Sequence, residues 1–139
     1  MKYLGLALVL TSCGIKNLPP ETDKDLIQYA AYFEEEATMR GRPLRATNMV
    51  FKKDLARKSY KKKEGRYTMA QCVRGHYYGG IIEIDPDVFN RLNEERRKML
   101  ILHEQGHCVL DLDHEPEGIM TEIIGEEYDK QDVDNLFKI

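Results

Sequence analysis

Apolar residues recur every three or four positions between residues 26 and 37. They are Leu26, Ala30, Phe33 and Ala37. This spacing places them on one face of a helix. Thr22, followed three positions later by Asp25, resembles a capping box, and Gly41 with Pro43 marks a stop. The pattern therefore predicts a first helix over about 22–40.

Three later segments have the apolar content and turn boundaries of strands. They are residues 44–53, 66–73 and 81–85. The basic stretch 54–66 separates the first two and predicts a hairpin or loop, with Gly65 as its turn residue. Pro86 ends the third strand because proline has no N–H to donate to a sheet.

Helical periodicity returns from about Asn93 and continues to Leu110. An irregular stretch follows over 111–126, and a last helix is expected over about 128–137. We see no internal repeat. Strands enclosed between helices in this order predict an α+β fold, in which a small mixed sheet packs on the long helix.

The composition is that of one soluble domain. The chain has 139 residues, of which 42% are hydrophobic and 32% charged, and a net charge of −3. This balance predicts no nucleic-acid partner, and we expect a monomer. A basic run covers residues 52–66 and an acidic run covers 111–134. Such runs are mostly solvated faces; substrate steering and contact with anionic lipid headgroups are the alternatives.

The N-terminus has the features of an export signal. Lys2 precedes a short apolar run, and Leu10-Thr11-Ser12-Cys13 resembles the lipobox of bacterial lipoproteins. The resemblance implies a signal peptide over 1–12, a lipidated tether over 13–20 attached through Cys13, and a domain over 21–139. We expect an exported protein anchored to the cell envelope, on the outer membrane if the host is Gram-negative.

Export changes the interpretation of the remaining cysteines. Cys72 and Cys108 form an even pair in an oxidising compartment, where a disulfide between them would be stable. The alternative is two small, buried, apolar side chains.

Residues 103–107 read His-Glu-Gln-Gly-His within the predicted long helix. Residues four apart on a helix are offset by about 40°, so His103 and His107 project from one face and can hold one zinc ion. Glu104 flanks them and can take a proton from a metal-bound water. His76, the one histidine outside residues 103–114, is expected at the surface.

Two helical histidines leave the zinc short of a third protein ligand. His114 would lie about 10 Å beyond His107 if the helix continued, which is too far for a shared ion. The chain must therefore leave the helix between them and fold back.

Here the segment resembles the metzincin metallopeptidases, and most closely the matrixin-like pattern HExGHxLGLxH. In that family a glycine ends the active-site helix and a third histidine completes the zinc site. The present chain departs from the pattern, with Leu110 at the glycine position and Asp113 at the position of the last histidine.

Two alignments restore the pattern. In the first, one helical residue is inserted, Asp111 replaces the glycine and His114 is the third ligand. In the second, the helix ends at Leu110 and Asp113 is the ligand. We favour His114, because aspartate tolerates a positive φ far better than leucine does.

The resemblance covers about residues 79–120 and extends to the family's methionine turn. Gly118-Ile119-Met120 follows His114, and Met120 would support the zinc ligands from below without binding the metal. Residues 80–85 resemble the rim strand, the edge strand that binds an extended peptide substrate in the family.

The resemblance implies a compact metzincin-like zinc endopeptidase that acts on peptides or proteins in the envelope or outside the cell, with Glu104 as the catalytic residue. The alternative is a structural zinc site or a degenerate peptidase that only binds peptides. A fourth protein ligand, for which Glu115 and Glu117 are the nearby carboxylates, would favour that alternative.

Overall fold

A computed structural model describes residues 17–125 and 127–138. The predicted signal peptide and Cys13 lie outside these residues, so they stay predictions. The helices and strands, in chain order, are η1 (a 3₁₀ turn, Lys24–Leu26), α1 (Ile27–Met39), β1 (Met49–Phe51), α2 (Leu55–Ser59), β2 (Ala70–Val73), β3 (Ile81–Ile84), α3 (Pro86–Arg91), α4 (Glu94–Cys108) and α5 (Lys130–Leu136).

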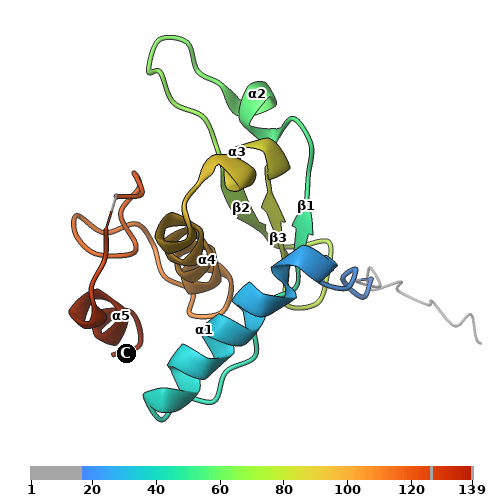
Figure 1. Cartoon of the computed structure of the whole chain (residues 1–139). Coiled ribbons are helices and arrows are strands. Elements are labelled where there is room, and N and C mark those ends of the chain that lie inside the picture. Colours follow the sequence, from blue (N-terminus) through green and yellow to red (C-terminus); the bar gives the residue numbers. More distant parts are fainter. Residues whose placement is uncertain (1–16, 126, 139) are drawn as a thin grey trace, which may run out of the picture.

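The fold is α+β, as predicted, and is built around a three-stranded mixed sheet. The strand order is β1-β3-β2, with β1 parallel and β2 antiparallel to β3. Helices α1 and α4 pack together, and α4 also lies against β2 and β3 (Figure 1). Helix α5 covers the other side of α4, so the long helix is enclosed between the sheet and the C-terminal helix.

Two apolar clusters fill the interior. The first joins the start of α1 and the first half of α4 to the sheet, through residues such as Tyr29, Ile82 and Leu100. The second joins α1 and the second half of α4 to α5, and it includes Met120. Helix α4 contributes to both clusters, and every one of its residues from Met99 to Gly106 is buried. Two of the three candidate ligands, His103 and His107, therefore stand on a helix that is largely buried.

The long helix begins as the sequence predicts. Asn93 is its N-cap, and the side-chain oxygen accepts a hydrogen bond from the backbone N–H of Arg96. Glu94 and Glu95 lie in the first turn, where negative charge is favourable. The start of α1 is different. The predicted capping role of Thr22 is wrong, because its hydroxyl instead accepts a hydrogen bond from the backbone N–H of Met49 and so ties the chain to β1.

Other segments differ from their predictions in extent or type. The strand expected over 44–53 is only the three residues of β1. The stretch 54–66 contains α2 as well as a small hairpin closed by a bridge between Lys61 and Arg66. Helix α3 was not predicted; Asp85 caps it by accepting hydrogen bonds from the backbone N–H groups of Asp87 and Val88.

The rim-strand prediction for residues 80–85 is wrong. That segment forms β3, which is paired on both sides and is the centre of the sheet. Its pattern of nearly continuous burial is typical of a central strand. The strand at the edge nearest the histidines is β2, the segment predicted over 66–73.

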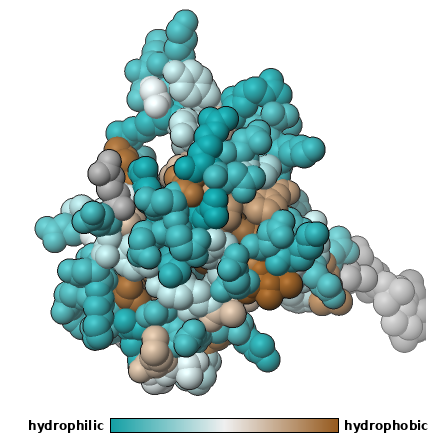
Figure 2. Space-filling model, in the orientation of Figure 1, coloured by the Kyte–Doolittle hydropathy of each residue, from teal (hydrophilic) through white to brown (hydrophobic). Residues whose placement is uncertain are grey.

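The basic run forms a lobe, defined as residues 52–67, that stands away from the rest of the molecule (Figure 1). Hydrophilic residues make up most of its surface in Figure 2. Among the described residues, no helix has the length and apolar character to cross a membrane.

Cys72 on β2 and Cys108 at the end of α4 form a disulfide that spans 36 positions of the sequence. It fastens the edge strand to the last residue of the long helix. Structural disulfides are typical of oxidising compartments outside the cytoplasm.

Removing this disulfide by the double substitution Cys72→Ala and Cys108→Ala should lower the free energy of unfolding by about 3–4 kcal/mol, because the unfolded chain gains loop entropy. Urea denaturation of the two proteins measures the difference. In the unreduced, unfolded protein both cysteines should resist alkylation; alkylation of both would contradict the disulfide.

Candidate metal centre

Three imidazoles converge at the end of α4. The ligand-capable ring nitrogens of His103, His107 and His114 all lie within 4.8 Å of one another. The Nε2 atom of His107 is 3.1 Å from Nε2 of His103 and 3.2 Å from Nε2 of His114. His103 is buried, His107 is partly buried and His114 is exposed, so the group opens toward solvent on the His114 side.

Backbone carbonyls orient two of these rings. Nδ1 of His103 lies 2.7 Å from the carbonyl oxygen of Ile119, and Nδ1 of His107 lies 2.6 Å from that of Leu112. A carbonyl only accepts, so each Nδ1 must carry the hydrogen and donate it. In the neutral tautomer each Nε2 is then a lone-pair acceptor. Burial also lowers the pKa of His103 to about 4, which keeps that ring neutral near pH 7.

The arrangement leaves acceptor atoms facing one another with no hydrogen between them. Such a contact is unfavourable unless a cation lies at the point where the lone pairs meet. Two nitrogens bound to one tetrahedral zinc at about 2.0–2.1 Å are separated by about 3.3 Å, close to the distances seen here. Ligating histidines that donate Nδ1–H to a carbonyl are the usual arrangement around zinc. The donor set therefore fits a zinc ion.

The fold-back that brings His114 to the helix occurs at Asp111. This residue has φ of 56°, in the left-handed region, as the alignment with Asp111 at the glycine position predicts. The N–H of Leu112 then donates to the carbonyl of Gly106, 3.1 Å away, which closes the helix end. The carbonyl of the same Leu112 orients His107. The turn therefore both brings His114 back to the helix and holds the imidazole ring of His107 in place.

Asp113 is not a member of the histidine group; its side chain is exposed. Within residues 17–125 and 127–138, the group contains no carboxylate and no thiol. Glu115 and Glu117 are therefore not fourth ligands in this structure, and Cys108 is committed to the disulfide. His76 is exposed and apart from the group, as expected.

Met120 packs against the helix that carries His103 and His107. A Cβ placed on Gly106 would be 2.5 Å from Sδ of Met120 and 3.3 Å from Cδ1 of Leu136. Any side chain at position 106 would have to displace the end of the buried Met120 side chain. The backbone carbonyl of Ile119, the preceding residue, holds His103. The turn thus supports the centre by packing and by a hydrogen bond.

Substitution of Gly106 by alanine should reduce the free energy of unfolding by about 1–3 kcal/mol, the usual cost of overpacking. Helix propensity alone would instead raise the free energy of unfolding, since alanine is favoured over glycine in a helix by about 1 kcal/mol. Urea denaturation distinguishes the two. Gly125→Ala, where a Cβ has its nearest neighbour at 3.7 Å, is the control. Stabilisation by Gly106→Ala would contradict the packing role of Met120.

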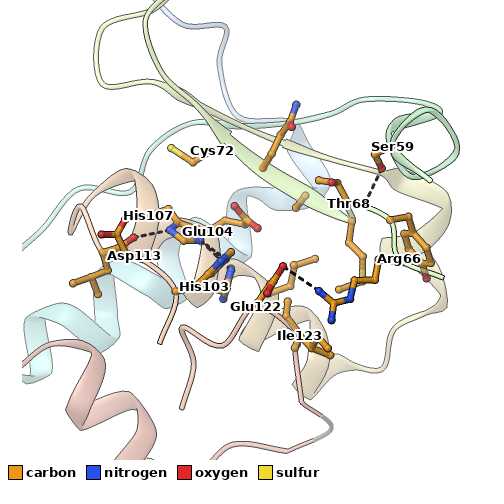
Figure 3. Close-up of a pocket in the computed structure, with 18 of the residues that line it drawn as sticks. Ser59, Arg66, Thr68, Cys72, His103, Glu104, His107, Asp113, Glu122 and Ile123 are labelled. Carbon is orange, nitrogen blue, oxygen red and sulfur yellow. Dashed lines mark hydrogen bonds and ion pairs between the residues drawn. The ribbon is translucent and has the colours of Figure 1, made fainter. Parts of the chain in front are cut away.

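Glu104 is buried next to His103, and its carboxylate accepts a hydrogen bond from the backbone of Cys72 on β2. Figure 3 shows it beside His103 and His107. Burial raises the pKa of Glu104 to about 7, although the hydrogen bond from Cys72 acts in the opposite direction. A carboxyl group with such a pKa can both accept and release a proton near neutral pH.

The histidines and Glu104 form one end of a cleft of about 890 Å³. Strand β2 forms one wall, the lobe contributes residues 59, 61 and 64–67, and the segment after Met120 supplies the opposite wall. Arg66 of the lobe pairs with Glu122 of that segment at 3.3 Å (Figure 3). The cleft is therefore bounded by elements far apart in the sequence, and the lobe is part of its wall.

No family model, curated protein or solved structure matches this chain. The resemblance to metzincins consequently rests on the motif residues themselves. The observed geometry establishes a group of three histidines that fits a metal ion.

Proposed function

We propose that this chain is a zinc-dependent endopeptidase of the metzincin type. One observation carries the proposal: three Nε2 atoms converge with two of their rings fixed through Nδ1, and the buried carboxylate of Glu104 lies beside them in a cleft. Because three protein ligands leave one position of a tetrahedral zinc for water, this donor set favours a catalytic over a structural site.

The residues would divide the chemistry as follows. His103, His107 and His114 hold the ion. A zinc ion held there would supply Lewis-acid chemistry, acting on the scissile carbonyl and making water a better nucleophile. Glu104 takes a proton from the attacking water and returns it to the leaving amine. The Glu104 carboxylate meets the backbone of Cys72 and lines the cleft.

The substrate would be a peptide or protein segment in extended form. Strand β2 lines the cleft and, among residues 17–125 and 127–138, pairs with β3 along one edge and with no strand along the other. An extended peptide could add to its free edge as a further strand, with its scissile bond carried toward the histidines. This assigns to β2 the role that the sequence resemblance gave to residues 80–85.

We further propose that the enzyme acts outside the cytoplasm, attached to the membrane through lipidated Cys13 after removal of residues 1–12. The disulfide between Cys72 and Cys108 supports an oxidising location. The lipid anchor itself rests on the lipobox resemblance, and mass analysis of the N-terminal peptide tests it.

The function is tested with purified protein and a broad library of peptides. We expect about one zinc per chain, cleavage of internal peptide bonds, loss of cleavage on chelation, and recovery when zinc is restored. A protein that binds zinc but cleaves no peptide would refute the peptidase proposal and leave the non-catalytic zinc module as the better interpretation.

A further inference from the structure

The reversal after α4 has an unusual residue at its centre. Asp111 adopts a left-handed backbone that glycine takes without strain and that L-residues with a Cβ adopt at a cost. If the turn opens, His114 loses its place and Leu112 loses its hydrogen bond to His107. Some contact must therefore hold the turn closed in the absence of a glycine.

Arg74, directly after β2, makes that contact with both sides of the turn. Its Nη1 lies 2.5 Å from Oδ1 of Asp111, and its Nη2 donates to the carbonyl of His107. The carbonyls at a helix C-terminus have no partner within the helix, and a cation is favourable there. One guanidinium thus caps the helix end and holds the side chain of the left-handed residue.

The position of Arg74 is itself fixed. It lies two residues after Cys72, whose disulfide with Cys108 ties this end of β2 to the last turn of α4. The Arg74 and Asp111 side chains are 51% and 83% exposed, and an isolated pair so exposed contributes little. The planar guanidinium bonds two groups at once, which lysine could not do in the same geometry.

We propose that Arg74 is a positioning residue for the metal centre, and that its clamp on Asp111 and His107 replaces the family's glycine. The inference rests on the proposed zinc site. Without the clamp, the turn is closed in a smaller fraction of molecules. The apparent zinc affinity falls in proportion to that fraction. Contacts of this kind around zinc ligands typically change affinity by about 10–100-fold.

The test measures zinc dissociation constants of the purified full chain by competition with a chelator. We expect Arg74→Ala to weaken zinc binding by about 10–100-fold. In a protein that already carries Asp111→Gly, adding Arg74→Ala should weaken zinc binding by less than about threefold. The reason is that glycine adopts the turn conformation without the clamp. Arg74→Lys should be intermediate. Arg57→Ala removes a comparable exposed pair with Asp54, away from the helix end, and should have no effect.

Comparing the effect of Arg74→Ala on zinc affinity with and without Asp111→Gly separates a positioning role from a general effect on stability. The free energy of unfolding of each metal-free variant is measured alongside, and Co²⁺ absorption spectra report the ligand geometry directly. If Arg74→Ala caused an equal loss of zinc affinity with and without the Asp111→Gly substitution, or no loss in either background, the role of Arg74 would be overturned. Failure of the wild-type protein to bind zinc would overturn the proposed function as well, whereas zinc binding without peptidase activity would leave the Arg74 result intact.

Discussion

Replacing Glu104 with glutamine should lower kcat/KM for peptide cleavage by about 10²–10⁴-fold while zinc stays bound. The amide keeps the shape of the side chain and can still meet the backbone of Cys72, but it cannot take a proton from the attacking water. The zinc ligands are separate groups, so metal content should not change. Steady-state kinetics and metal analysis of the same preparations check both parts.

Glu117→Gln is the matched control for this experiment. Glu117 is exposed, follows the third histidine closely and is absent from the histidine group. Both zinc content and cleavage should therefore be retained. If Glu104→Gln cleaved peptides within tenfold of the wild-type rate, the proton acceptor would have to be another group.

The second large effect is expected at the third ligand. His114→Ala should weaken zinc binding by more than about 100-fold, beyond the effect usual for residues that only support a ligand. Asp113→Ala should change it by less than threefold, because its side chain is exposed and does not belong to the histidine group. Zinc dissociation constants measure both. A larger loss from Asp113→Ala than from His114→Ala would restore the alternative alignment, in which aspartate is the ligand.

The sequence predicted the helix and the placement of its two histidines on one face well because the determinants are local. The cap at Asn93, the helical periodicity and the spacing of His103 and His107 all lie within one element. The left-handed conformation at Asp111 was also predictable, because His114 can return to the helix only if the chain reverses and leucine disfavours that backbone.

The sheet and its role were predicted less well because strand order depends on contacts distant in sequence. Residues 81–84 have the apolar run of a strand, but only the paired structure shows that β3 is central and β2 is the edge beside Glu104. Helices α2 and α3 are too short to give a clear periodic signal.

The supports of the metal centre were largely hidden for the same reason. Arg74 is 37 positions from Asp111, and no local pattern links them. The even number of cysteines in the domain, Cys72 and Cys108, was compatible with a disulfide and also with two buried thiols. The packing of Met120 against Gly106 followed from no local pattern, and only the family resemblance placed Met120 beneath the histidines.

The central claim is that three histidines and no fourth protein group hold one zinc ion. Crystallography of the zinc-loaded protein, with anomalous scattering measured at the zinc edge, tests it most directly. We expect a single site within about 2.0–2.1 Å of Nε2 of His103, His107 and His114, with water in the fourth position. Absence of zinc from these histidines, or a carboxylate such as Asp113 or Glu117 bound to the ion, would contradict it.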